Sequence, residues 1–205
     1  MIDDDSPPTI TEVTGTVAVV RLNRPAERNP LSIATLQDLS RTTSRLFSRA
    51  DIQTVIFTGT DDVFASGANI RELSQLDTEA ALRFSKFGQE LFQTIAEARP
   101  LTIAAINGYC MGGGLDFALA CDIRVASESA VFSHPGARLG IVTGWGGTQR
   151  LPRVIGRARA LEFFATARRY SSHEALELGL VSHISDPVIS QALKLYGKLE
   201  GKLAG

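Results

Sequence analysis

Ile106-Asn107-Gly108-Tyr109-Cys110-Met111-Gly112-Gly113-Gly114-Leu115-Asp116 is the stretch that decides the fold of this chain. An apolar strand precedes it at 101–106, three consecutive glycines follow the turn, and a short helix is expected from Leu115. Glycines at a helix N-terminus leave backbone N–H groups exposed, where they can stabilise a developing oxyanion. They also permit tight strand-to-helix packing, so this stretch alone leaves both interpretations open. The spacing fits neither a phosphate loop nor a dinucleotide fingerprint.

Composition narrows the class of protein. The 205 residues are 44% hydrophobic, which suffices for one buried core and favours a single domain. Lys plus Arg number 21 against 22 for Asp plus Glu, so no bulk charge favours nucleic acid or a membrane as partner. Cys110 and Cys121 lie eleven apart without metal-ligand spacing, which predicts buried reduced thiols and no metal site. The acidic, proline-containing start and the lack of a long apolar run predict a cytoplasmic protein.

Strands and helices alternate along the chain. β-branched or apolar runs predict strands, and apolar residues at helical spacing predict helices between them. Ser32 is the expected N-cap of the first helix, and Ser171 with Glu174 forms a capping box for a helix that Gly179 ends. The expected strands are 16–20, 54–58, 101–106 and 123–125, and the expected long helices follow Ser32 and span 78–98. This alternation predicts an α/β domain with much parallel pairing.

The tail at 188–205 has one apolar helical face, made of Val188, Ala192, Leu195, Leu199 and Leu203. Little of the chain is left for this face to pack against. We therefore expect it to pack on the body, on another subunit, or on a segment outside this sequence, and we predict a homo-oligomer.

Five ordered motifs connect the chain to a known family. They are Arg24-Pro25 with Asn29-Pro30-Leu31-Ser32, Phe64 to Asn69, Asn107-Gly108 with Gly112-Gly113-Gly114, Cys121-Asp122-Ile123, and Gly146 to Leu151. In order and spacing this set resembles the crotonase superfamily, that is, the enoyl-CoA hydratase/isomerase family. The resemblance implies an α/β fold made of a crotonase-like spiral of ββα units. It assigns 1–187 to the core domain and 188–205 to a C-terminal helix in a region shorter than the family's, and it implies a trimer or a dimer of trimers.

The resemblance also implies how substrate is held. Two backbone N–H groups, which match Ala68 and Gly113, would grip the thioester carbonyl of an acyl-CoA, and removing one such donor typically lowers the rate by about 10²–10³. Coenzyme A enters as part of the substrate, so no separate cofactor is expected. Arg71 and Arg28 are candidate phosphate partners. The expected substrate-binding residues are Arg24, Arg28, Ala65, Ser66, Gly67, Asn69, Ile70, Gly112, Gly136 and Trp145.

The two acid/base positions of the family differ from the usual pair of carboxylates. The first matches Asp116, whose side chain is one methylene shorter than Glu and so reaches about 1.5 Å less. The second matches Gly136, which transfers no proton. His134 is the nearest residue that could replace the lost base, because imidazole titrates near neutral pH. Asp116 and His134 are therefore the candidate catalytic side chains.

Gly136 separates the specialised chemistries of the family. Isomerases of the family usually need the second carboxylate, and the related dehalogenases need an Asp near Gly144-Trp145-Gly146, where none stands. Naphthoate synthases share the glycine and use bound bicarbonate, but their Asp before Gly-Trp-Gly is replaced here by Ile141-Val142-Thr143. Three alternatives stay open: an acyl-CoA or enoyl-CoA enzyme relying on Asp116, a bicarbonate-assisted enzyme, and a non-catalytic acyl-CoA-binding protein.

Overall fold

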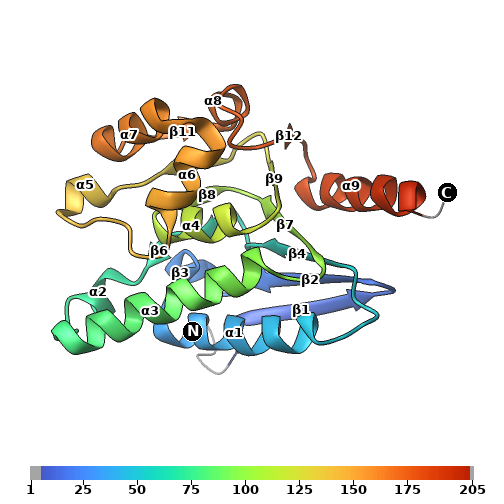
Figure 1. The fold of residues 1–205 in the computed structure, drawn as a ribbon, viewed down its shortest axis with the longest axis horizontal. Helices are drawn as coiled ribbons and strands as arrows, with labels where there is room; N and C mark the ends of the chain where they lie inside the picture. Colours follow the sequence, from blue (N-terminus) through green and yellow to red (C-terminus); the bar gives the residue numbers. More distant parts are fainter. Residues whose placement is uncertain (1–5, 204–205) are drawn as a thin grey trace.

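A six-stranded sheet forms the centre of the computed structural model, which describes residues 6–203, with side chains as far as Gly197. The strand order is β1-β2-β4-β7-β9-β12, with β1 and β2 antiparallel and the other neighbours parallel (Figure 1). The strands are β1 (Thr9–Thr14), β2 (Val17–Leu22), β4 (Thr54–Thr58), β7 (Leu101–Ile106), β9 (Ile123–Ala126) and β12 (His183–Ile184). Strands β4 and β7 are almost wholly buried, which explains their continuous apolar and β-branched composition.

A second, four-stranded sheet has the order β11-β10-β8-β5. Its strands are β5 (Val63–Ala65), β8 (Tyr109–Met111), β10 (Val131–Ser133) and β11 (Tyr170–Ser171), and the short strands β3 (Pro30–Leu31) and β6 (Gly67–Ala68) pair with each other. The chain alternates between the two large sheets, because β4, β7 and β9 are each followed by a strand of the second sheet and then by a helix. This arrangement confirms the predicted α/β spiral of ββα units.

Helices cover one face of the main sheet and enclose the larger core. The helices are α1 (Ile33–Phe47), α2 (Ile70–Leu73), α3 (Thr78–Ala96), α4 (Gly113–Ala120), α5 (Gly136–Leu139), α6 (Gly147–Ile155), α7 (Arg157–Thr166) and α8 (Ser172–Glu177), with a 3-10 turn at Pro25–Glu27. Phe117 of α4 lies at the centre of this core and contacts the rings of Phe57, Phe64 and Phe92 at centroid distances of 5.1–5.5 Å. The helix that carries the site is thereby fixed by aromatic packing.

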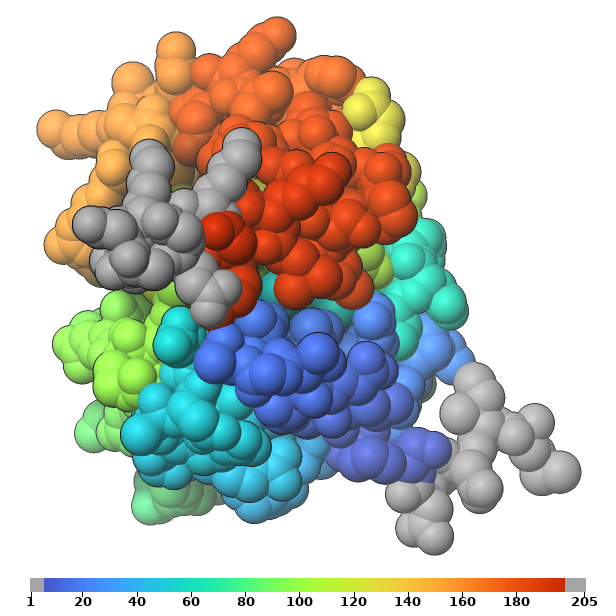
Figure 2. Space-filling model, turned by 90° about the vertical axis from the view of Figure 1, so that its right-hand side faces the viewer, coloured from blue at the N-terminus to red at the C-terminus, as the bar shows by residue number. Residues whose placement is uncertain are grey.

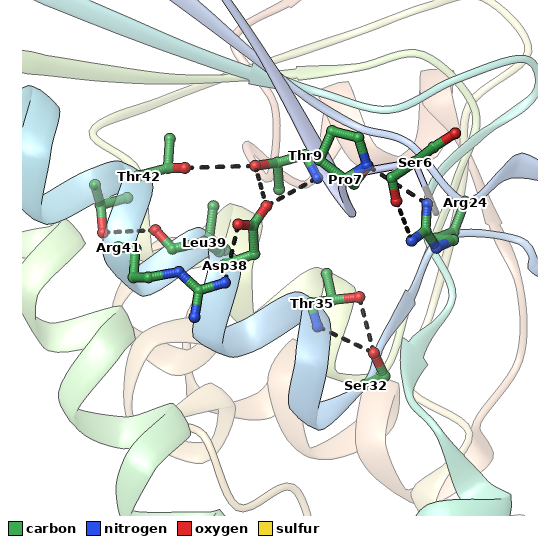
Figure 3. A network of polar contacts seen from close by, with 11 residues as sticks. Ser6, Pro7, Thr9, Arg24, Ser32, Thr35, Asp38, Leu39, Arg41 and Thr42 are labelled. Atoms are coloured by element: carbon green, nitrogen blue, oxygen red, sulfur yellow. Dashed lines mark hydrogen bonds and ion pairs between the residues drawn. The ribbon is translucent and has the colours of Figure 1, made fainter. Parts of the chain in front are cut away.

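Polar contacts fasten the N-terminal strand to α1 (Figure 3). The backbone N–H and the hydroxyl of Thr9 both donate to Asp38 Oδ2, at 3.1 and 2.7 Å. Ser32 caps α1 as predicted, because its Oγ accepts from the Thr35 backbone N–H at 3.1 Å. The Arg24 guanidinium donates to the carbonyl oxygens of Ser6 and Pro7. Arg24 therefore ties the start of the chain to the loop after β2.

Helix α9 (Val188–Leu203) lies on the opposite face of the main sheet (Figures 1 and 2). Val188 and Ala192 are buried against Ile56 and Ile103, and the Tyr196 hydroxyl contacts Thr16 Oγ1 at 2.5 Å. The apolar face of the tail thus packs on the body, which was one of the three expected partners. Its need for a partner no longer supports an oligomer, so the predicted trimer stays a prediction without that argument. The side chains of Leu199 and Leu203 lie outside the described residues.

Several predicted elements match closely and others were missed. The strands at 54–58 and 101–106 and the capping box of Ser171 and Glu174 are confirmed. The chain between the strand at 123–126 and the capping box was expected to contain a long loop, yet it holds β10, α5, α6 and α7. None of the helices in the part of the chain that the structure describes has the length and apolar character needed to span a membrane.

Candidate active site

Three loops meet at one edge of the second sheet. Strands β5, β8 and β10 are parallel neighbours, so their carboxyl ends lie at the same edge. The loop after β5 begins at Ser66, the loop after β8 at Gly112, and the loop after β10 at His134. A hydrogen bond of 2.9 Å from the Gly112 N–H to the Ser133 carbonyl joins two of these loops. The topology therefore brings together residues that are far apart in the sequence.

Each of the three consecutive glycines is required for a different reason. Gly112 has φ +52° and ψ −120°, a backbone conformation that side chains disfavour. A Cβ on Gly113 would enter the Trp145 ring, and a Cβ on Gly114 would clash with the Ala65 carbonyl. Close packing thus explains Gly113 and Gly114, while the conformation of Gly112 turns the chain into α4. The packing interpretation of the stretch is correct, and it leaves the exposed amides in place.

The two expected oxyanion donors lie side by side. A Cβ built on Gly113 would be 3.5 Å from the Ala68 backbone nitrogen, and one built on Gly67 would be 3.1 Å from the Gly113 nitrogen. Gly113 is the first residue of α4, and Gly112 gives that helix no side-chain cap. The first N–H groups of a helix have no partner within the helix, and its dipole favours negative charge there. The Ala68 and Gly113 nitrogens are thus close neighbours, as the family resemblance predicts.

Asp116 is buried, with only 1% of its surface exposed. Its Oδ2 accepts a hydrogen bond from the Thr143 hydroxyl, and its Oδ1 lies 3.5 Å from His134 Nε2. The carboxylate also contacts the first turn of α6, since a Cβ on Gly147 would clash with Oδ1. Asp116 is therefore a core residue and not part of the protein surface. The amino end of α6 favours negative charge at this position.

His134 lies beside Asp116, and only 6% of its surface is exposed. The Phe164 ring of α7 meets the imidazole edge to face at a centroid distance of 5.2 Å. Asp116 Oδ1 and His134 Nε2 are both buried, and neither has a hydrogen-bond partner among the residues that the structure describes. Buried polar atoms are rarely left unpaired in native proteins. Such a pair is therefore suited to a bound substrate or water.

Gly136 lies where the family's second carboxylate is expected. A Cβ at this position would be 2.5 Å from the Ile141 carbonyl oxygen and 3.4 Å from His134 Nδ1. The Ile141 N–H in turn donates to the Gly136 carbonyl at 3.0 Å, which closes the loop. The space on the side-chain side of Gly136 is thus filled by backbone. A side chain at position 136 therefore fits only if the 136–141 backbone moves.

A cavity of about 220 Å³ connects these groups. Its apolar wall includes Phe84 and Trp145, whose ring centroids are 5.2 Å apart. Trp145, which was expected to bind substrate, therefore lines the cavity and also belongs to the core. The predicted site residues that line the cavity are Ser66, Gly67, Ala68, Ile70, Gly112, Gly113, Asp116, His134, Gly136 and Trp145.

A groove of about 490 Å³ lies next to the cavity, between the 26–30 and 66–71 segments. Ser66, Ala68 and Ile70 line both spaces, and Asn69 and Arg71 line the groove alone. Arg28 lies outside it, with its guanidinium 4.7 Å from the Tyr109 ring centroid. Two further predicted binding residues line neither space: Arg24 bonds to the N-terminal segment, and Ala65 is fully buried beneath Gly114.

Several lining residues were missed in the sequence, and two of them contact the candidate catalytic groups or their neighbours. Thr143 contacts Asp116, and the Ile141 carbonyl lies beside Gly136. Both stand just before Gly144-Trp145-Gly146, where the sequence comparison noted only an absent Asp. The predicted buried thiols are confirmed, since Cys110 and Cys121 are free and burial raises the pKa of each. In the described part of the chain, no three His, Cys, Asp or Glu side chains cluster as metal ligands would.

The fold and the site together define a protein of the crotonase type. The chain matches the family described as enoyl-CoA hydratase/isomerase over residues 12–203. It is 42% identical to a Bacillus subtilis protein whose name is enoyl-CoA hydratase/isomerase YngF, over 83% of this chain and 66% of that protein. It is 37% identical to a short-chain-enoyl-CoA hydratase of Clostridium acetobutylicum, over 87% of this chain and 69% of the relative.

Solved structures agree with this assignment. An enoyl-CoA hydratase from Bacillus anthracis superposes with a TM-score of 0.90 at 34% identity, covering 94% of this chain and 76% of that structure. The chain belongs to the enoyl-CoA hydratase/isomerase family of the crotonase superfamily. It spans about two thirds of the length of the two curated relatives.

Proposed function

We propose that this chain binds acyl-CoA or enoyl-CoA thioesters and catalyses proton transfer at Cα or Cβ. The Ala68 and Gly113 amides polarise the thioester carbonyl, and Asp116 and His134 carry protons at the reacting carbon. The observation that supports this most is the buried pair of Asp116 Oδ1 and His134 Nε2, which lie 3.5 Å apart on the wall of the cavity that the two amides share. Neither atom has a hydrogen-bond partner among the residues that the structure describes. Negative charge that develops on the thioester oxygen is stabilised by such preorganised donors.

His134 supplies what Gly136 lacks in this proposal. A general acid or base must first lie within hydrogen-bond reach of the reacting group, and Asp116 and His134 line the same cavity. Asp116 Oδ1 takes a proton from Cα to give the enolate, and His134 Nε2 donates a proton to Cα or Cβ, which restores a neutral thioester. Proton exchange with water returns both side chains to their starting states. Because the 136–141 backbone fills the position of the second carboxylate, we do not expect efficient hydration of simple enoyl-CoA substrates.

The groove beside the cavity fits the pantetheine arm. It lies between the 26–30 and 66–71 segments, the second of which carries several of the residues expected to bind substrate, and it shares Ser66, Ala68 and Ile70 with the cavity. Arg71 on the groove and Arg28 beside Tyr109 are the proposed phosphate partners. Coenzyme A arrives with the substrate, so the chemistry requires no separate cofactor. A homo-oligomer and a cytoplasmic location remain predictions.

Mass spectrometry of an acyl-CoA panel incubated in D₂O tests the proposal. We expect deuterium at Cα of at least one thioester, and loss of this exchange in Asp116→Ala. Binding without exchange, together with no effect of Asp116→Ala on any reaction, would instead favour a non-catalytic binding protein. Crotonyl-CoA hydration is the second assay. A turnover in the usual enzyme range of about 1–10³ s⁻¹ would contradict the claim that Gly136 disables this reaction.

Added bicarbonate separates the remaining alternative. A bicarbonate-assisted enzyme would exchange protons faster when bicarbonate is supplied. Because the Ile141 carbonyl occupies the space beside Gly136, we expect no stimulation.

A further inference from the structure

We infer that Thr143 is a positioning residue that holds the Asp116 carboxylate in its reactive orientation. This inference rests on the proposed function, because it concerns the residue that the proposal makes the proton acceptor. The Thr143 hydroxyl donates to Asp116 Oδ2, whereas Oδ1 has no hydrogen-bond partner among the described residues. Thr143 thereby occupies one carboxylate oxygen and leaves the other for the substrate.

The alternative orientation of the carboxylate is close at hand. His134 Nε2 lies only 3.5 Å from Oδ1, so a small rotation would pair the carboxylate with the imidazole. In that pairing the carboxylate and the imidazole would be bonded to each other, and neither would be available to the substrate. A donor on Oδ2 opposes the rotation, because hydrogen bonds to a charged group are the stronger ones. Thr143 therefore opposes a closer, hydrogen-bonded pairing of Asp116 with His134.

The loop around Thr143 is fixed well enough to hold this position. Its next carbonyl, of Gly144, accepts a hydrogen bond from Gln89 Nε2 of α3 at 2.6 Å. The Trp145 carbonyl accepts from Arg150 of α6 at 3.1 Å, and the Trp145 ring packs against Gly88 and Gly113. Supporting groups of this kind determine how accurately a reactive side chain is held.

Two substitutions separate the hydroxyl from the shape of the side chain. Thr143→Val keeps the volume and removes the donor, and Thr143→Ser keeps the donor. Val142→Ala is the matched control, because Val142 is the neighbouring residue, is 81% exposed and does not line the cavity. We expect kcat for Cα proton exchange to fall about 10- to 100-fold in Thr143→Val with KM changed less than about threefold. Thr143→Ser recovers the rate to within about threefold, and Val142→Ala leaves it unchanged.

A double-mutant cycle shows whether Thr143 acts through Asp116. In an Asp116→Asn background, Thr143→Val is expected to have no further effect on exchange, because the charged acceptor is already gone. An equal loss in both backgrounds would overturn the inference, since the hydroxyl would then act on something else.

The deciding measurement does not depend on turnover. ¹⁵N-histidine NMR of the folded protein at constant pH reports the His134 Nε2 signal, with only two other histidines, His173 and His183, to assign. We expect Thr143→Val to move this signal as the freed carboxylate pairs with Nε2, and Thr143→Ser to retain the wild-type position. An unmoved signal in Thr143→Val, or an equal shift in Thr143→Ser, would overturn the inference. If the wild type exchanges no proton with any thioester, the proposed function fails while the NMR comparison still decides the role of Thr143.

Discussion

Substituting Gly136 tests whether the missing carboxylate has left an open space or a filled one. A Cβ at this position would lie 2.5 Å from the Ile141 carbonyl oxygen, which belongs to the backbone and cannot rotate away as a side chain end would. Forcing an atom into such a site typically costs about 1–3 kcal/mol. For a chain of this size about 1 kcal/mol corresponds to about 2–4 °C in Tm, so Gly136→Ala should melt about 2–12 °C lower.

The assay is thermal and urea unfolding of Gly136→Ala and Gly136→Glu beside a matched glycine control. Gly197 suits this purpose, because it lies within α9 and a Cβ there would meet no atom within 4 Å. Gly197→Ala should be stabilising by about 0.5–1 kcal/mol through the better helix propensity of Ala. Both measurements are made on the same day and in the same buffer.

The second measurement in this test is the crotonyl-CoA hydration activity of both Gly136 variants. We expect neither Gly136 variant to gain crotonyl-CoA hydration, because the 136–141 backbone prevents a carboxylate from reaching the cavity. The reasoning would be refuted if Gly136→Glu folded as stably as the wild type and hydrated crotonyl-CoA much faster. Unchanged stability of Gly136→Ala alone would show that the loop yields easily.

Three further predictions concern stability and thiol chemistry. Ser171→Ala removes the N-cap of α8 and should lower the free energy of unfolding by about 1 kcal/mol in urea at neutral pH; no change would mean that the cap is replaced. The Ser171 backbone N–H and the Arg168 side chain lower the pKa of Glu174 to about 2. This carboxylate therefore stabilises the fold above the unfolded pKa of about 4.3, and its contribution fades as pH falls towards 2. The gap in unfolding free energy between wild type and Glu174→Gln should narrow between pH 6 and pH 2.5, whereas a constant gap would contradict the assignment. Burial raises the pKa of the Cys110 and Cys121 thiols, so a disulfide reagent should label neither thiol in the native state and both in denaturant; rapid native labelling would show that the core opens.

Local patterns in the sequence were sufficient for much of the fold. The strands at 54–58 and 101–106 are buried on both faces, so their apolar runs end where burial ends. Ser32 and the Ser171 with Glu174 pair are local signals that need no tertiary contact to act. Helices α6 and α7 were missed because glycines precede them instead of capping side chains, and because Pro152 lies inside α6.

The candidate site was predictable in its residue types but not in its geometry. Motifs identified Ala68, Gly113 and Asp116, yet only the packing of α4 against α6 buries Asp116. One signal was present: Gly113–Ala120 is apolar on every side apart from Asp116, which is typical of a buried helix. Thr143 lies 27 residues after Asp116 in the sequence, and the two residues meet because the 136–146 segment folds back onto α4. No local sequence pattern predicts this contact.

Gly136 is a second residue that the sequence identified without its surroundings. In the sequence it is a position at which the expected carboxylate is absent. In the structure the Ile141 carbonyl fills that place, and His134 lies on the wall of the cavity next to Asp116. With the loop in this conformation, position 136 accommodates only a residue without a side chain.

The most direct test of the central claim is the infrared spectrum of a ¹³C-carbonyl-labelled acyl-CoA thioester bound to the protein. If the Ala68 and Gly113 amides grip the thioester oxygen, the carbonyl stretch moves to lower frequency on binding. The shift persists in Asp116→Asn, in which the carboxylate is gone but the amides remain. A bound thioester whose carbonyl stretch equals that of free acyl-CoA would contradict the account.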